Sequence, residues 1–168
     1  MTTIRALAAA DADRFKALRL LAIETSPTAV WPTREEEASR SIDEVAARIR
    51  TTSNQSVFGA FAGEALVGIA GVRREPFAQV RHKATIWGVF VDPSHRRKGI
   101  AQDLLAAAAG HADEQWGSAQ LMLCVNAENA AAKGLYASLG FRTFGVEPRA
   151  ICVDGRFYDE EHMCKPLR

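Results

Sequence analysis

The sequence predicts an α/β fold: a mixed, largely antiparallel sheet of six to seven strands flanked by about four helices, in a single domain over residues 1–168. Two observations predict this class. Apolar residues alternate with a period of two in several short runs, and helical patterns with recognisable caps lie between those runs. With 48% hydrophobic residues, the chain can bury one sizeable core, and no repeat, low-complexity tract or linker divides it.

The first elements are a short strand at 3–7 and a helix that begins near Asp11 and ends at Pro27. Asp is a residue type that caps helices, and Pro cannot continue one. We therefore expect Asp11 to cap this helix. The apolar residues that share one face of it are Phe15, Leu18, Leu21 and Ala22.

Two capping-box spacings follow, Thr33 with Glu36 and Ser41 with Glu44. In this motif a Ser or Thr side chain and a Glu three residues later satisfy each other's backbone N–H groups at a helix start. We expect a second helix within 34–51.

An antiparallel meander is predicted for the middle of the chain. The runs 57–62 and 66–73 flank Gly63, which favours a hairpin, and the run 83–91 continues the sheet. A long helix is expected at 98–116, followed by a strand at 119–125. One stripe of that helix is apolar and would pack on the sheet: Ile100, Leu104, Leu105, Ala108, Ala112 and Trp116.

A second hairpin is predicted near the end of the chain. Asp154 and Gly155 lie between two alternating runs, and Asp-Gly is a strong signal for a tight turn between strands. Residues 149–153 and 156–163 are therefore expected to pair.

The turn between 83–91 and the long helix carries three cations, Arg96, Arg97 and Lys98, directly before Gly99. The first N–H groups of a helix lack carbonyl partners and attract anions, and Gly lets the backbone approach a ligand closely. The turn can therefore hold phosphate. It lacks the Gly-Lys-Ser/Thr ending of a P-loop and the three glycines of a dinucleotide fingerprint. Taken alone, an ordinary turn with solvated charges is an open alternative.

A second motif lies downstream and decides between these interpretations. Together the two motifs resemble the GCN5-related N-acetyltransferases, the GNAT family, over residues 82–141. Ala101 is a departure, because many members carry Gly there; a small residue is tolerated in the first helical turn. The resemblance is carried by Arg96-x-x-Gly99-x-Ala101 and by Leu123-x-Val125-x-x-x-Asn129-x-x-Ala132-x-x-Leu135-Tyr136-x-x-x-Gly140-Phe141.

The resemblance implies acetyl-CoA as cosubstrate, bound where the strands 83–91 and 119–125 splay apart. The pantetheine arm would pair with the free edge of the first of these strands, and the phosphates would bind the basic turn. The implied cofactor-binding residues are Val89, Phe90, Val91, Arg96, Arg97, Lys98, Gly99, Ile100, Ala101 and Asn129.

Acetyl transfer to an amine needs a stabilised oxyanion and a proton for the leaving thiolate. A backbone N–H near Val91 could stabilise the oxyanion. Tyr136 is the candidate proton donor, because a phenol is neutral at working pH and the family places this helix near the sulfur. From periodicity alone, Tyr136 would be a core aromatic. Asn129 could cap its helix, bind pantetheine, or do both.

No carboxylate lies in 83–91, where many relatives place the general base. Glu75, His82, Asp92 and His95 are nearby in sequence, and each is more simply a solvated loop residue; a water chain is the alternative. Cys124 as an acyl-carrying nucleophile is disfavoured, because no histidine lies near it in sequence. Cys124, Cys152 and Cys164 lack metal-ligand spacing and read as reduced structural thiols, and no metal is expected.

The formal net charge of +1 argues against nucleic-acid binding, and no run is apolar enough to span a membrane or to act as a signal segment. We expect a cytoplasmic enzyme acting on a primary amine by direct transfer. A small-molecule acceptor is favoured over a protein N-terminus or lysine, and many relatives form homodimers. Acidic residues at Glu24, 35–37 and 159–161 could attract a cationic amine or simply be solvated. The alternatives are a non-catalytic acyl-CoA-binding sensor or interaction module and, more weakly, a generic anion-binding domain.

Overall fold

The computed structural model describes residues 1–168 and confirms the predicted α/β architecture. One seven-stranded sheet runs in the order β1-β2-β3-β4-β5-β7-β6. Its only parallel pair is β4 with β5. The strands are β1 (Thr3–Ala6), β2 (Gln55–Ala62), β3 (Ala65–Arg74), β4 (Lys83–Val91), β5 (Gln120–Asn126), β6 (Arg142–Val153) and β7 (Arg156–Pro166).

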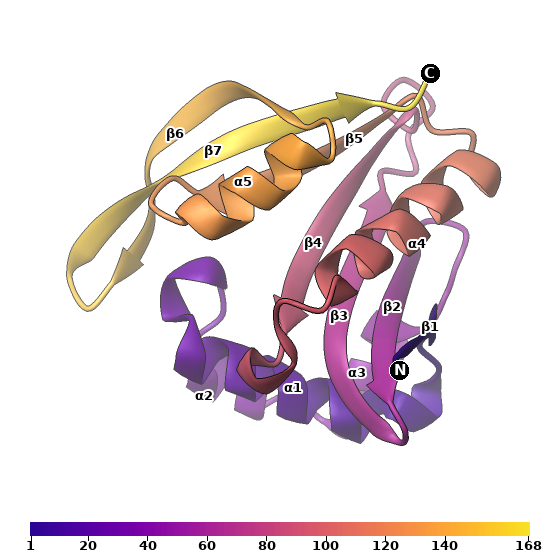
Figure 1. The fold of residues 1–168 in the computed structure, drawn as a ribbon, viewed down its shortest axis with the longest axis vertical. Coiled ribbons are helices and arrows are strands. Elements are labelled where there is room, and N and C mark those ends of the chain that lie inside the picture. Colours follow the sequence, from indigo (N-terminus) through magenta and orange to yellow (C-terminus); the bar gives the residue numbers. More distant parts are fainter.

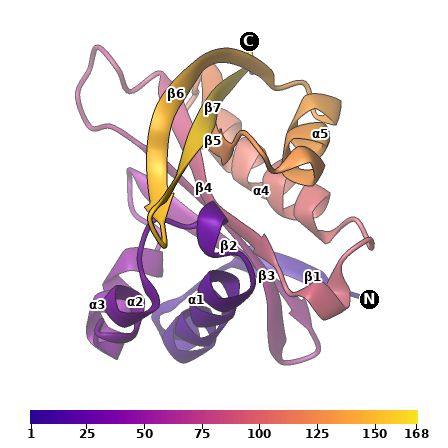
Figure 2. The ribbon, with the colours of Figure 1, turned by 90° about the vertical axis from the view of Figure 1, so that its left-hand side faces the viewer.

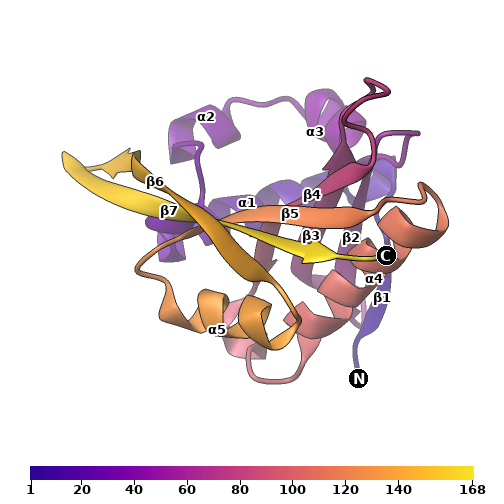
Figure 3. The same ribbon diagram turned by 90° about the horizontal axis from the view of Figure 1, so that it is seen from above.

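Helices cover both faces of the sheet, as Figures 1 and 3 show. On one face lie α1 (Ala12–Thr25), α2 (Arg34–Ala38) and α3 (Ile42–Ile49), and on the other lie α4 (Ile100–Glu114) and α5 (Ala130–Ser138). No helix is long and apolar enough to cross a membrane.

The single helix expected within 34–51 is two helices, α2 and α3. The hydroxyl of Thr33 accepts a hydrogen bond from the N–H of Glu36 at 3.2 Å, and that of Ser41 accepts from the N–H of Glu44 at 3.1 Å. Both capping boxes are complete. Because a capping box forms only at a helix start, the second box begins a new helix, which raises the number of α-helices to five.

Asp11 occupies the N-cap position of α1 as expected, but its side chain makes no capping hydrogen bond to that helix. Its carboxylate accepts hydrogen bonds from the Arg5 guanidinium at 2.8 and 2.9 Å and from the N–H of Ala8 at 2.9 Å. A charge-assisted hydrogen bond to the Arg5 guanidinium is stronger than a capping hydrogen bond to a backbone N–H, so the carboxylate turns toward β1. Asp11 therefore joins the first strand to the start of α1.

The stripe predicted for α4 is buried against the sheet: Ile100, Leu104, Leu105, Ala108 and Ala112 are each at most 4% exposed, and Trp116 packs at the edge of the same core. A second core lies under α1 and α3 on the opposite face. The α4 stripe fixes the start of this helix at the end of β4, and so positions the basic turn.

The expected splay between β4 and β5 is present. The two strands pair only from Lys83 to Thr85, opposite Gln120 to Met122, and then diverge (Figure 1). Gly88 lies just beyond, with a φ of +64° where the register between β3 and β4 shifts. Only glycine adopts this conformation readily, so β4 bends there and leaves one edge without a partner.

The C-terminal hairpin forms as predicted around Asp154 and Gly155, whose φ values are 50° and 80°. Both strands extend further than the sequence suggested, since β6 begins at Arg142 and β7 continues to Pro166. Strand β7 pairs with β5 along its other edge. The hairpin therefore forms one wall of the gap that opens between β4 and β5.

Candidate active site

A cavity of ≈ 820 Å³ passes through the gap between β4 and β5. It is lined from the α5 side by Asn129, Ala132 and Tyr136, and from the α1 side by Arg19 and Arg48. Because β4 and β5 are not hydrogen-bonded there, a ligand can contact groups from both faces of the sheet. A donor could thus enter from one face and an acceptor from the other.

The basic turn lies at one end of β4. Gly99 has a φ of +77° and is the N-cap of α4. A Cβ placed there would meet nothing nearer than the Gln102 side chain at 3.8 Å, so the space in front of the helix start is open. Arg97 and Lys98 are exposed. This arrangement fits a phosphate group.

Arg96 has a structural contact that the sequence did not predict. Its Nε donates a hydrogen bond of 3.0 Å to the carbonyl of Val91, and its guanidinium lies 5.6 Å from the centre of the Phe90 ring. Arg96 therefore fastens the turn to the end of β4. Its part in phosphate binding stays a prediction.

Several predicted cofactor residues have side chains in the core. Phe90 and Val91 are each 8% exposed and Ile100 is 2% exposed, while Val89 and Ala101 are half-buried. Any ligand contact of Phe90, Val91 and Ile100 must therefore come mainly from backbone atoms. This agrees with the expected pairing of an extended ligand along the free edge of β4.

Tyr136 lines the cavity and packs edge-on against Phe141, with 5.9 Å between the ring centres. Burial raises the pKa of its phenol to about 12. The hydroxyl is therefore protonated at neutral pH, as a proton donor must be. Asn129 lines the same cavity, and its Oδ1 accepts a hydrogen bond of 3.1 Å from the N–H of Ala132, so its role as helix cap is confirmed.

None of the four candidate bases near β4 lines this cavity. Asp92 accepts hydrogen bonds from the N–H and hydroxyl of Ser94, which lower its pKa, and His95 contacts the same hydroxyl. Glu75 lines only a smaller cavity. The structure therefore places none of these four side chains at the gap.

The carboxylate that does line the cavity is Glu160 on β7, and it is 4% exposed. Its Oε1 accepts a hydrogen bond of 2.9 Å from the indole Nε1 of Trp31, and no cation lies within ion-pair distance. The sequence analysis named Glu160 within 159–161, as a residue that could attract a cationic amine or simply be solvated, and did not predict its burial. The alternation of Tyr158, Glu160 and His162 along β7 is the signal that puts all three on one face.

The segment that carries Trp31 joins α1 to α2 and rises from the helices toward the β6–β7 hairpin (Figure 2). The amide of Asn126 on β5 donates a hydrogen bond of 3.1 Å to the carbonyl of Thr28 in this segment. Two contacts therefore hold it over the acceptor side of the gap, and both Thr28 and Trp31 line the cavity.

On the α1 side of the cavity, three arginines lie within ion-pair distance of the Glu37 carboxylate. Glu37 is fully buried and accepts hydrogen bonds from Arg19 Nε at 3.4 Å and Arg48 Nη1 at 3.2 Å, and Arg40 Nε lies 3.8 Å from its other oxygen. The sequence analysis missed Arg19. Its position one residue after Leu18, on the buried face of α1, is a signal for a charged group with a specific partner.

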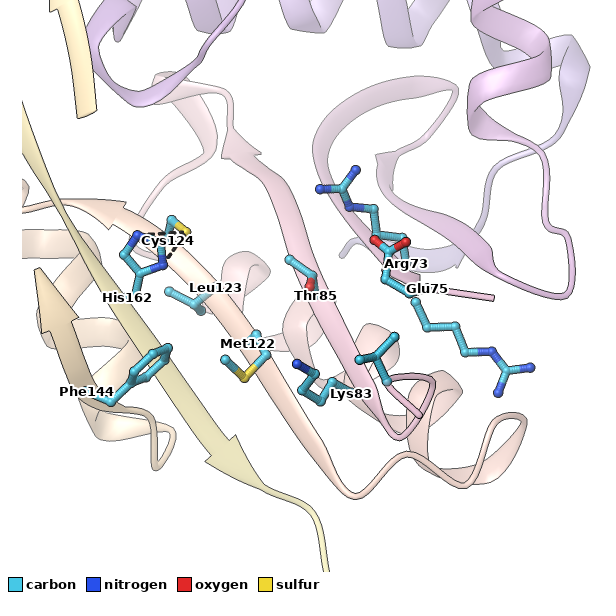
Figure 4. Close-up of a pocket in the computed structure, with 11 residues that line it drawn as sticks. Arg73, Glu75, Lys83, Thr85, Met122, Leu123, Cys124, Phe144 and His162 are labelled. Atoms are coloured by element: carbon cyan, nitrogen blue, oxygen red, sulfur yellow. Dashed lines mark hydrogen bonds between the residues drawn. The ribbon is translucent and has the colours of Figure 1, made fainter. Parts of the chain in front are cut away.

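Cys124 has a histidine neighbour, contrary to the argument from sequence. His162 lies opposite it on β7, with Nδ1 3.3 Å from the sulfur (Figure 4). The His162 Nε2 is 3.1 Å from a carboxylate oxygen of Glu147. Cys124 and His162 line a smaller cavity of ≈ 300 Å³, and Cys124 also lines the larger one. Burial, with Glu160 and Glu147 nearby, raises the pKa of the thiol and disfavours a thiolate nucleophile.

All three cysteines are free, and no group of three or more His, Cys, Asp or Glu side chains is arranged to hold a metal ion.

The profile of the Acetyltransferase (GNAT) family matches residues 17–141, and the chain belongs to this family. The chain is 42% identical to the [Ribosomal protein bS18]-alanine N-acetyltransferase of Escherichia coli K12 over 62 residues. These matched residues are 37% of this chain and 41% of that enzyme. It is 39% identical over 62 residues to the mycothiol acetyltransferase of Kocuria rhizophila, 37% of this chain and 20% of that enzyme. The chain thus spans less than half of these curated relatives.

Among solved structures, the fold is similar to that of YncA, described as a putative acetyltransferase from Salmonella typhimurium with its cofactor acetyl-CoA. The TM-score is 0.86 at 23% identity, over 100% of this chain and 95% of the other. The GNAT fold predicted from the sequence is therefore confirmed, and the expectation of acetyl-CoA as cosubstrate agrees with this neighbour.

Proposed function

We propose that this protein is an N-acetyltransferase that moves the acetyl group of acetyl-CoA to the primary amine of a small molecule by direct transfer. The observation that carries the proposal is the single cavity through the β4–β5 gap, lined by Tyr136 on one side and by ionisable groups on the other. A donor and an acceptor bound from opposite faces of the sheet would meet there without a covalent enzyme intermediate.

Each predicted cofactor group has a place in this proposal. The free edge of β4 would bind the pantetheine amides, and the turn at Arg97, Lys98 and Gly99 would bind the phosphates. Tyr136, neutral at working pH, would protonate the leaving thiolate. A backbone N–H near Val91 would stabilise the oxyanion that forms during attack.

A small acceptor is favoured because the acceptor side is partly enclosed. The segment with Trp31 lies over it, fastened to β7 and β5. The curated relatives act, by their names, on a ribosomal protein and on mycothiol, so both acceptor classes occur among similar proteins. The cytoplasmic location stays a prediction from the sequence.

The proposal is tested by calorimetric titration of the protein with acetyl-CoA, coenzyme A, ATP and pyrophosphate, followed by an assay of thiol release with amines. Gly99→Val should abolish coenzyme A binding, because a β-branched residue resists the left-handed conformation and fills the space before the helix. Gly117→Val is the matched control, since Gly117 has a φ of +62° at the other end of α4.

Each outcome separates the proposed function from its alternatives. Coenzyme A binding lost only in the Gly99 variant, with thiol release, supports the acetyltransferase. Binding without thiol release for any amine would indicate the acyl-CoA sensor. Pyrophosphate binding as tight as acetyl-CoA binding would indicate a generic anion-binding domain.

A further inference from the structure

We propose that the acceptor is a zwitterion, an amino acid or a related compound with an acidic group beside its primary amine. Arg19 and Arg48 bind the acidic group, and Glu160 receives the ammonium and then its proton. The inference rests on the proposed function and names the substrate class of the same cavity.

At the α1 side of the cavity, positively charged side chains outnumber the negatively charged partners that pair with them. Three arginines, Arg19, Arg40 and Arg48, share the single carboxylate of Glu37. The side chains of Arg19 and Arg48 are only 4% and 25% exposed, and burial together with repulsion from Arg19 lowers the pKa of Arg48. Buried like charges in contact are costly unless an anion joins them. A carboxylate of the acceptor would supply the missing negative charge.

The arginines also face the place where transfer would occur. A Cβ at Gly88 would lie 3.5 Å from Nη1 of Arg19, so this guanidinium lies beside the bend where β4 leaves β5. Arg48 lies 5.0 Å from the centre of the Trp87 ring, which fixes its plane. The planar, multidentate guanidinium matches the geometry of a carboxylate or phosphinate group.

The negative end is Glu160, on the far side of the gap. It is a buried carboxylate with a neutral N–H donor and no cation partner. A buried charge without a counter-ion is unfavourable in the empty protein and marks a binding position for a cation. The ammonium of the acceptor is that cation, and the amine must enter from this face.

The same carboxylate completes the chemistry. Glu160 takes one proton from the ammonium, and the freed nitrogen attacks the thioester carbonyl. The C–N bond forms and the C–S bond breaks, and the leaving thiolate takes the phenolic proton of Tyr136. The attacking nitrogen carries a positive charge once the C–N bond has formed. It loses one proton, which returns through water to the Tyr136 phenolate, and Glu160 then releases its proton to solvent. Glu160 thereby fills the role for which β4 offers no carboxylate.

The overall charge of the cavity discriminates against simple amines. Four arginines and two glutamates line it, so an acceptor that carries only positive charge is repelled. An acceptor with both charges binds the two ends at once. The sequence-based idea that acidic residues attract a cationic amine is thereby kept for Glu160, and the arginines add a site for an acidic group.

The test compares matched pairs of acceptors that differ by one carboxylate. With acetyl-CoA saturating, thiol release is measured for leucine against 3-methylbutylamine, phenylalanine against 2-phenylethylamine, tyrosine against tyramine, and lysine against 1,5-diaminopentane, and for phosphinate analogues of the same amino acids. We expect the acid-bearing member of an accepted pair to have a kcat/KM at least about tenfold higher, the value of one charge-assisted hydrogen bond.

Two variants test which residues bind the acidic group and the amine of the acceptor. Arg48→Gln should raise the KM for the acid-bearing member by about tenfold and reduce the preference within a pair, whereas Arg50→Gln, at the exposed end of the same helix, should not. Glu160→Gln keeps a side-chain oxygen for Trp31 but loses the charge. It should lower kcat by roughly 100-fold, and the exposed Glu147→Gln is its control.

A preference for the decarboxylated member, or equal use of both, overturns the inference in the wild-type protein, whatever the variants do. Coenzyme A binding with no acetylation of any acid-bearing acceptor also overturns it. Failure to bind coenzyme A, or thiol release absent with every amine, instead contradicts the proposed function itself.

Discussion

The indole Nε1 of Trp31 donates a hydrogen bond of 2.9 Å to the carboxylate of Glu160, which lies 129 residues further along the chain. Trp31 lies in the segment over the acceptor side of the cavity, and Glu160 lies on β7. The bond therefore orients a buried carboxylate and holds the covering segment with one contact. An indole that is 71% exposed contributes little to the core.

Trp31→Phe should consequently reduce acetyl transfer without unfolding the protein. Removing the N–H leaves Glu160 without its donor, and we expect kcat/KM for the acceptor to fall by about tenfold. The melting temperature should change little. Phe77→Leu, at another aromatic side chain that is 71% exposed, is the control. Equal kcat/KM for Trp31→Phe and the wild type would show that this bond is dispensable.

Tyr136→Phe should lower kcat by roughly 100-fold and leave acetyl-CoA affinity unchanged, because the ring stays and only the donated proton is lost. Since burial raises the pKa of this phenol to about 12, its deprotonation should produce no loss of rate below about pH 11. Steady-state rates across this range test both statements. An unchanged kcat in the variant would remove Tyr136 from the reaction.

The same phenol makes a prediction about stability. Its pKa is about 12 when folded and near 10 when unfolded, so its contribution to folding is present below pH 10 and is lost as pH rises toward 12. Between about pH 9 and about pH 11 the wild type should lose about 1 kcal/mol of unfolding free energy relative to Tyr136→Phe. Urea unfolding at the two pH values measures this difference, and Tyr158→Phe on the exposed hairpin is the control.

Local features of the fold could be predicted from the sequence, and contacts between distant elements could not. Strand β4 and the glycine at the start of α4 follow from an apolar run and a basic turn, and both are found where expected. Trp31 and Glu160 gave no such signal, because their meeting depends on how the segment after α1 folds over β7. Glu37 and Glu160, which the sequence grouped with acidic residues that could be solvated, are both buried by the tertiary structure.

Glycines at two positions should respond in opposite directions to the same substitution. At Gly71 on β3, a Cβ would overlap the ring of Trp87, which lies under Arg48. Gly71→Ala should destabilise the protein by about 1–3 kcal/mol and weaken acceptor binding. At Gly110 in α4 nothing lies within 4 Å of a Cβ, and Gly110→Ala should stabilise it by about 0.5–1 kcal/mol. Thermal unfolding of both variants compares them, and equal shifts would contradict the packing of Trp87.

Asp11 should stabilise the fold in a pH-dependent way. The hydrogen bonds from Arg5 hold the pKa of Asp11 at about 2, below its ordinary value of 3.8, so the stabilisation is present above pH 3.8 and is lost as pH falls toward 2. At neutral pH, Asp11→Asn should cost about 2 kcal/mol, and the cost should shrink near pH 2. Urea unfolding measures this, with the exposed Asp13→Asn as control. A cost independent of pH would mean that packing, rather than the ion pair with Arg5, is responsible.

Cys124→Ser decides between direct transfer and an acyl-enzyme. His162 lies against the sulfur and contacts Glu147, which is the residue set of a thiol nucleophile, yet the two carboxylates near the thiol and its burial raise its pKa. Direct transfer predicts that Cys124→Ser keeps kcat within about threefold of the wild type, because serine is close in size to cysteine and no step of direct transfer uses the sulfur. Initial rates with both substrates varied should give intersecting lines in double-reciprocal plots. Parallel lines, together with an inactive serine variant, would instead assign the acetyl group to this sulfur.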